Sequence, residues 1–91
     1  MNFVDKSFIV PQDFTRRFCM NFLNRINRVE SKIYFATLER NIPAQSIIGL
    51  LSSGIKCCDI IRINVLNEDL EQAEKDLRFV EMVMLDECEN A

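Results

Sequence analysis

The chain has 91 residues, 48% of them hydrophobic and 27% charged, which indicates one small globular domain and excludes a disordered segment. Its net charge of −3 and pI near 4.9 do not favour nucleic-acid binding, which normally needs a basic face. No apolar run approaches the roughly 18 residues that span a bilayer, and the first ten residues lack the basic start of a signal peptide. We therefore expect a cytoplasmic protein that binds neither nucleic acid nor membrane.

Cysteine usage argues against a metal or disulfide framework. Cys57 and Cys58 are adjacent and do not have C-x-x-C spacing, and the chain contains no histidine. We expect reduced thiols, no metal site and no cofactor. The four cysteines are Cys19, Cys57, Cys58 and Cys88.

The first elements are a strand and a helix. Residues 1–10 are rich in strand-forming side chains, and Pro11 ends them because proline cannot donate to a sheet ladder. A helix is predicted to begin at Arg16, with the Thr15 hydroxyl capping a free backbone N–H. Its apolar face carries Phe18, Phe22, Leu23, Ile26 and Val29.

A hairpin is predicted next. Apolar and polar residues alternate over residues 31–38, which is typical of a half-buried strand. Glu39 and Arg40 stand at the turn, and a short return strand covers residues 41–43. A short apolar helix over residues 44–53 follows, with Gly54 as its C-terminal stop.

The last two elements are a strand over residues 60–66 and a helix over residues 69–84. Acidic residues at the start of this helix favour its positive end. Its predicted buried stripe consists of Leu70, Ala73, Leu77, Val80 and Met84. The element order predicts an α+β open-faced sandwich, with one domain over residues 1–86 and a frayed tail over 87–91.

Two blocks resemble the HPr family, the phosphocarriers of the bacterial sugar phosphotransferase system. The segment from Gln45 to Ile55 is similar to the family's K-S-I-x-G-V-x-S-L-G-I block. Glu68, Asp69 and Ala73 look like the family's opening of the last helix. The resemblance implies a four-stranded antiparallel sheet with two long helices and one short helix on one face.

The family's active-site motif, roughly G-L-H-[TA]-R-P-A, is altered. Thr15 stands at the histidine position, and Arg17, which matches the phosphate-positioning arginine, is kept. Phe18 and Cys19 replace the proline and alanine. Turn glycines of the family are also replaced, and cysteine tolerates positive φ poorly, so the loop at Cys57 and Cys58 is expected to differ in shape. The replaced glycines are at Asp13, Glu39, Cys58 and Asn67.

Without histidine the chain cannot form the labile phosphoramidate that the family passes on. Thr15 is interpreted as a helix cap, and the alternative is a phosphoacceptor for an unrelated kinase. Cys19 could carry a thiophosphate in principle, but its place on the apolar helix face favours core packing. We therefore expect a protein that is not an enzyme.

Three partner-binding features remain. Arg16 and Arg17, with Thr15, form a candidate anion or partner site at the helix end; the alternative is an ordinary solvated end. The resemblance implies that Ser46 is phosphorylated by an ATP-dependent kinase, after which the product binds a LacI-type regulator; the alternative is a plain N-cap. The resemblance also implies that an apolar docking patch lies on the short helix, unless its members are core. The patch consists of Ile47, Ile48 and Leu51.

Two functions follow as hypotheses. The first is a regulatory or adaptor protein of the sugar phosphotransferase system, switched by serine phosphorylation in carbon catabolite control. Its partners would be the serine kinase, a transcription regulator or sugar-system enzymes. The second is a diverged interaction module with no phosphorylation-linked role. We expect a monomer or a weak, strand-exchanged dimer.

Overall fold

The elements follow the predicted order in the computed structural model, which describes residues 2–89. Strands and helices alternate as strand, helix, strand, strand, helix, strand, helix, which confirms the predicted α+β class. The elements are β1 (Asn2–Ile9), α1 (Arg16–Ile26), β2 (Lys32–Ala36), β3 (Asn41–Pro43), α2 (Ile47–Leu51), β4 (Ile60–Asn67) and α3 (Leu70–Glu89).

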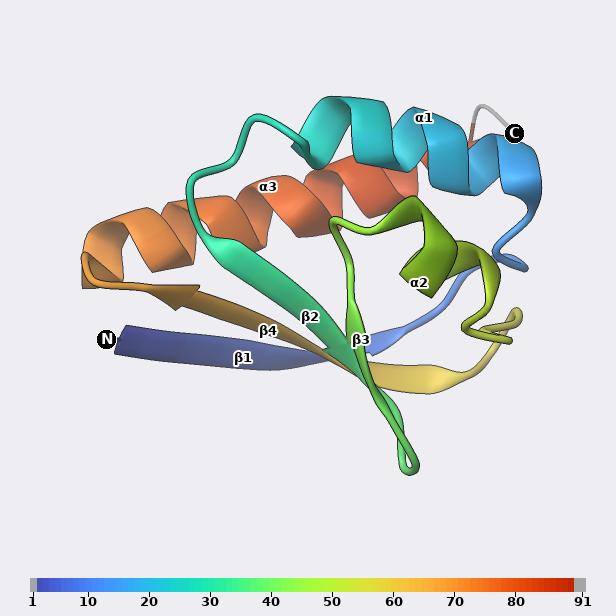
Figure 1. Ribbon diagram of the computed structural model, residues 1–91, viewed down its shortest axis with the longest axis horizontal. Helices are drawn as coiled ribbons and strands as arrows, with labels where there is room; N and C mark the ends of the chain where they lie inside the picture. The colour runs from blue at the N-terminus through green and yellow to red at the C-terminus, as the bar shows by residue number, and fades with distance from the viewer. Residues whose placement is uncertain (1, 90–91) are drawn as a thin grey trace.

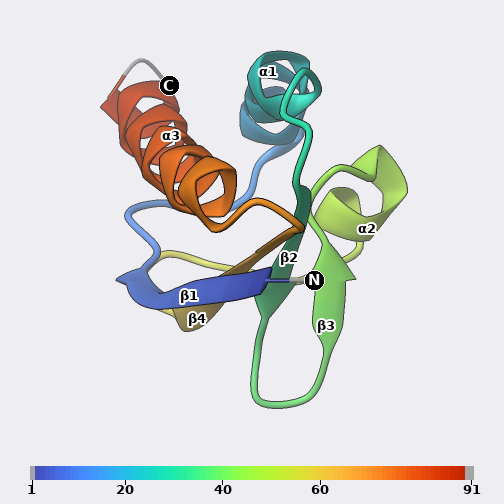
Figure 2. The ribbon, with the colours of Figure 1, turned by 90° about the vertical axis from the view of Figure 1, so that its left-hand side faces the viewer.

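The four strands form one antiparallel sheet in the order β1-β4-β2-β3. The helices all lie on one face of it (Figure 1). Figure 2 shows α1 and α3 side by side above the sheet, with α2 beside them near β3. The arrangement is the predicted open-faced sandwich, in which one face of the sheet is covered and the other is bare.

Strand alternation produces this one-sided burial. On β4, Ile61, Ile63 and Val65 are buried under the helices, whereas Ile60 and Arg62 point to the bare face and are exposed. Successive strand residues point to opposite faces, so a period of two in the sequence gives one apolar face.

Four phenylalanine rings connect α1 to the sheet. Phe14 and Phe18 have ring centroids 4.9 Å apart, and Phe18 and Phe22 stack at 5.6 Å. Phe35 of β2 lies 5.7 Å from Phe22 and 6.0 Å from Phe14. Aromatic pairs at these separations add about 0.5–1.5 kcal/mol each beyond their buried area. This aromatic cluster therefore fixes where α1 begins.

A buried carboxylate ties α3 to the loop before β2. Asp76 is 5% exposed, and its Oδ2 accepts from the Ser31 hydroxyl at 2.5 Å and from the Ser31 N–H at 3.3 Å. Its Oδ1 accepts from Gln72 Nε2 at 2.8 Å. Asn67 Nδ2 donates to Ser31 Oγ at 3.0 Å, so the end of β4 joins the same network.

Helix α3 is longer than predicted. It continues to Glu89, whereas its end was predicted near residue 84, and residues 90–91 lie outside the described part. That the tail over residues 87–91 frays stays a prediction. Arg25 Nη1 donates to Asp86 Oδ2 at 2.5 Å and to Glu87 Oε2 at 3.0 Å, which holds the last turns against α1. No helix within residues 2–89 is long and apolar enough to cross a membrane.

Two other predictions need correction. Leu70 was assigned to the buried stripe of α3 but is 46% exposed, because it is the first helical residue and lies beyond the end of the core. The short helix is Ile47–Leu51, not residues 44–53. Ala44 instead donates its N–H to the Ile33 carbonyl and prolongs the sheet pairing, which delays the start of the helix.

The loop at Cys58 keeps a conformation that suits glycine. Cys58 has φ 75, in the left-handed region, and its N–H donates to the Val10 carbonyl at 2.7 Å. The hydrogen bond holds a cysteine in a positive-φ position, which a residue with a side chain rarely adopts. That this loop differs in shape from the family's stays a prediction.

Replacing Asp76 with alanine should destabilise the fold by about 1–3 kcal/mol, because the buried Ser31 N–H and hydroxyl lose their acceptor. The measurement is the free energy of unfolding from urea titration. Glu74→Ala, at an exposed position of the same helix, should change it by less than about 0.5 kcal/mol. Equal effects of the two substitutions would contradict a structural role for Asp76.

Candidate functional site

Thr15 caps α1, as its position in the sequence predicted. It is extended (φ −69, ψ 162), and its Oγ1 accepts from the Phe18 N–H at 3.1 Å. Its carbonyl accepts from the Cys19 N–H at 2.9 Å, and its own N–H donates to the Asp13 carbonyl at 2.8 Å. The hydroxyl is therefore engaged with the backbone of its own helix, and the sequence has no histidine that could activate it.

A shallow cleft lies beside this helix end. It has a volume of about 450 Å³ and is lined by Pro11, Gln12, Asp13, Thr15, Arg17 and Cys57. Arg17 is exposed there and brings a guanidinium to the N-terminal end of α1, where backbone N–H groups favour anions. Arg16 is exposed as well but is not part of the lining. The structure thus brings Thr15 and Arg17 together and leaves Arg16 outside the cleft.

The two replaced motif residues belong to the core. Phe18 is 1% exposed and packs between the rings of Phe14 and Phe22. Cys19 is fully buried, and this burial raises the pKa of its thiol to about 11. A thiol that stays protonated at neutral pH is a weak nucleophile, so the geometry argues against phosphate transfer through Cys19.

Ser46 caps the short helix α2. It is extended (φ −113, ψ 120), half-buried, and its Oγ accepts from the Gly49 N–H at 3.1 Å. A Cβ added at Gly49 would come within 3.1 Å of the Pro43 carbonyl oxygen, so α2 sits close against the end of β3. At the other end of α2, Arg40 Nη2 donates to the Ser52 carbonyl at 2.8 Å.

The predicted apolar patch on α2 is smaller than expected. Ile48 is 76% exposed and Leu51 is 44% exposed, whereas Leu50 is buried as predicted. Ile47 is half-buried and packs against the core, so it contributes less to the surface than was predicted. No α2 residue lines the cleft at the α1 end, although the two helices lie next to each other (Figure 2).

Sequence reasoning assigned no role to the loop that completes the cleft. Cys57 donates its N–H to Asp13 Oδ1 at 2.9 Å, so a segment 44 residues away forms one wall. The paired cysteines were visible in the sequence, but their place beside Asp13 depends on the β1–β4 pairing. Within residues 2–89, no three histidine, cysteine, aspartate or glutamate side chains gather to hold a metal ion.

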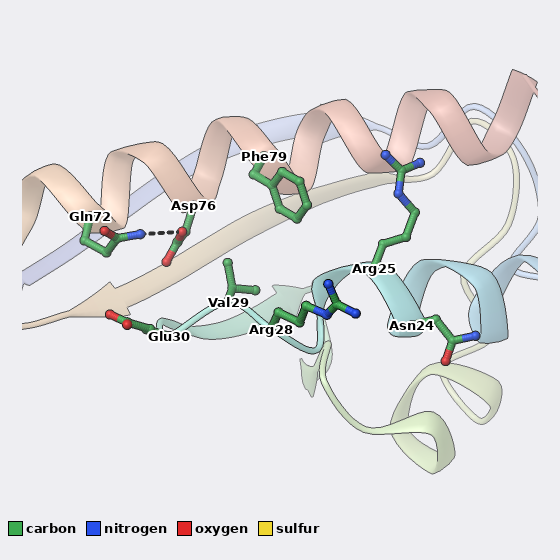
Figure 3. Close-up of a pocket in the computed structure, with 8 residues that line it drawn as sticks. All are labelled: Asn24, Arg25, Arg28, Val29, Glu30, Gln72, Asp76 and Phe79. Carbon is green, nitrogen blue, oxygen red and sulfur yellow. Dashed lines mark hydrogen bonds between the residues drawn. The ribbon is translucent and has the colours of Figure 1, made fainter.

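A separate groove of about 560 Å³ runs between α1 and α3, away from all the predicted site residues (Figure 3). Arg25 on its rim is paired with Asp86 and Glu87, and hydrogen bonds to Glu87 and then Asp86 raise the pKa of its guanidinium. Asp76, at the opposite end of the groove, is occupied by Ser31 and Gln72. Arg25 thus ties α1 to α3, and Asp76 ties α3 to the loop before β2, so both groups already serve the fold.

The fold and the helix end together define an HPr-like open-faced sandwich. The sequence matches the PTS-HPr family, described as "PTS HPr component phosphorylation site", over residues 8–81. The chain therefore belongs to the HPr family. No curated protein matches its sequence significantly.

Solved structures agree with this assignment at the level of the fold. A phosphocarrier protein HPr from Bacillus anthracis str. Ames is 24% identical with a TM-score of 0.79, over 91% of this chain and 98% of that one. The histidine-containing phosphocarrier protein of Mycoplasma is 20% identical with a TM-score of 0.77, over 93% and 96%. HPr-C-His from Thermoanaerobacter tengcongensis is 20% identical with a TM-score of 0.65, over 92% and 96%.

Replacing Thr15 with alanine should lower the free energy of unfolding by about 0.5–2 kcal/mol, because the Phe18 N–H loses its acceptor. Thr15→Ser keeps the hydroxyl and should stay within a few tenths of a kcal/mol of the parent. Thermal or urea unfolding of the two variants checks this. If alanine is tolerated as well as serine, the hydroxyl does not act as a cap.

Proposed function

We propose that this chain is a regulatory or adaptor member of the sugar phosphotransferase system that does not carry phosphate on histidine. The observation that carries the proposal is the residue at the family's histidine position. Thr15 stands there, its hydroxyl caps α1, and the chain has no histidine elsewhere. The protein is not an enzyme, it acts in the cytoplasm, and its partners are proteins.

The chemistry supports loss of phosphocarrier activity. A carrier must hold phosphate in a bond labile enough to pass on, and imidazole nitrogen provides this near neutral pH. A phosphothreonine ester is too stable for transfer to a sugar-system enzyme. Binding of a partner protein is the role that remains for the N-terminal end of α1.

Ser46 is proposed as the regulatory phosphorylation site. Its hydroxyl is half-buried at the start of α2, and the Gly49 N–H that it binds could donate to a phosphate oxygen instead. In the relatives that the sequence resembles, the matching serine is modified by an ATP-dependent kinase and then read by a LacI-type regulator. The same switch here would place the chain in carbon catabolite control.

The docking surface is proposed to combine apolar and basic parts. Ile48 and Leu51 expose apolar area on α2, and Arg16 and Arg17 expose positive charge on the neighbouring α1. A partner with an apolar centre and acidic groups at its rim would complement both. The chain would bind as a monomer, or as a weak strand-exchanged dimer.

The alternative function is an interaction module with no phosphorylation-linked role. The observation that favours it is the amount of change around the former active site, where Phe18 and Cys19 are core residues and the turn glycines are replaced. Such a module would use the same surface without a phosphate switch.

Two incubations followed by intact-mass measurement distinguish the regulator switched by phosphorylation from the interaction module without a switch. Phosphoenolpyruvate with the first enzyme of the system should add no phosphate, while a histidine-containing family member in the same tube becomes phosphorylated. ATP with the family's serine kinase should add one phosphate. Ser46→Asn should prevent it, because asparagine preserves the cap but has no hydroxyl.

Ser52→Ala is the matched control, since Ser52 is an exposed serine at the other end of the same short helix, and this variant should still accept one phosphate. Absence of phosphate in the kinase tube would remove the switch and leave the interaction module. Phosphorylation in the first tube would overturn both readings.

A further inference from the structure

The adjacent Cys57 and Cys58 form the one exposed thiol pair that the proposed function does not use. Both side chains are exposed, and their Sγ atoms lie 3.4 Å apart. Adjacent residues seldom point their side chains the same way, because successive side chains of an extended segment alternate. The positive φ of Cys58 turns the chain so that the two thiols converge.

Hydrogen bonds from outside the turn hold this pair in place. The Cys57 N–H donates to Asp13 Oδ1 at 2.9 Å, and the Cys58 N–H donates to the Val10 carbonyl at 2.7 Å. Asp59 closes the turn by accepting the Lys56 N–H at 2.9 Å. The backbone of the turn is therefore held in a shape from which both thiols can reach one ligand, which lowers the entropy cost of binding it with both.

The separation of the sulfurs selects the kind of atom they can share. A disulfide needs an S–S bond of about 2.05 Å and Cα atoms usually about 4.4–6.8 Å apart, whereas neighbouring Cα atoms are about 3.8 Å apart. A direct bond between Cys57 and Cys58 would therefore be strained. A single bridging atom fits the pair better than a bond between the sulfurs.

The same separation distinguishes among bridging atoms. If each bond to sulfur is about 2.3 Å, a sulfur separation of 3.4 Å corresponds to an angle of about 95° at the bridging atom. Pyramidal trivalent centres such as arsenic(III) have angles near this value. A linear two-coordinate copper(I) would need the sulfurs about 4.6 Å apart. A tetrahedral zinc would accept a separation near that of this pair, but it needs two further donors, and no three such side chains gather within residues 2–89.

We propose that Cys57 and Cys58 form a chelating site for a thiophilic trivalent centre, with organoarsenic(III) groups as the representative ligand class. For phenylarsonous acid, two As–S bonds form and two As–O bonds break. Each thiol proton leaves with a hydroxide as water, and arsenic remains trivalent, so no oxidant or reductant is needed. The argument for this site does not rest on the proposed regulatory function.

The third substituent of the bound centre has room beside the pair. Cys57 lines the cleft at the α1 end together with Pro11, Asp13 and Arg17. A flat apolar group on arsenic would lie against this shallow surface. Occupancy would cover Arg17 and connect the dithiol to the surface proposed for partners.

The test titrates the reduced full-length chain with phenylarsonous acid and records intact mass and free thiols. The expected result is one phenylarsenic group per chain with loss of two titratable thiols. Cys57→Ser and Cys58→Ser should each weaken binding by about 10²–10⁴-fold, because the second bond is then intermolecular. Cys58→Gly should weaken binding to the same extent while retaining the fold, since glycine accepts φ 75.

Cys19→Ser and Cys88→Ser are the matched controls and should leave the affinity unchanged. Cys88 is the stricter control, because it lies near enough to Cys57 for the two thiols to interact. Burial, then Glu87 and Cys57, raise the pKa of its thiol to about 11. Loss of binding in Cys88→Ser with retention in Cys58→Ser would overturn the proposal in favour of a different pair. Absence of a one-to-one adduct with the parent chain would also overturn it.

Discussion

The placement of α1 on the sheet depends on the packing of Phe18 between Phe14 and Phe22. These rings, with Phe35 behind them, set the position and tilt of α1 above the sheet. Truncation of a buried phenylalanine typically costs about 3–5 kcal/mol, a large part of the stability of a domain this small. The cleft, the helix cap and the contact between α1 and α2 all follow from this one position.

The same packing shows how the family's fold accommodates the altered residues near the start of α1. Phe18, the motif residue after Arg17, is a large aromatic side chain that fits in the core by stacking on Phe22. The Thr15 hydroxyl accepts from the Phe18 N–H, one of the helix-end donors that could otherwise bind an external anion.

Local patterns in the sequence predicted much of this fold. The alternation on β2 and β4, the return strand Asn41–Pro43 and the cap at Thr15 depend only on neighbouring residues, so they could be read directly. The family assignment came from short blocks at fixed spacing. The caps at Thr15 and Ser46 also match their predicted positions.

Features that depend on distant residues could not be predicted. Asp76 stands beside the predicted apolar stripe, and its burial requires Ser31, 45 residues earlier. The extension of α3 requires Arg25, which is 61 residues from Asp86. Ile47 looked like Ile48 in the sequence, and only the helix orientation against β3 turns one inward and leaves the other exposed. The wall that Cys57 adds to the cleft also depends on a distant residue, Asp13, 44 positions earlier in the chain.

The positive φ of Cys58 has a consequence for the dynamics of the sheet. The Val10 N–H to Asp59 carbonyl bond and the Cys58 N–H to Val10 carbonyl bond extend the β1–β4 ladder past its last regular pair. A side-chain-bearing residue in this conformation stores about 1–2 kcal/mol, which is released when the extension opens. The Val10 and Cys58 amides are therefore expected to exchange their hydrogens by local opening, faster than the amides at the buried centre of β4, which exchange only on global unfolding.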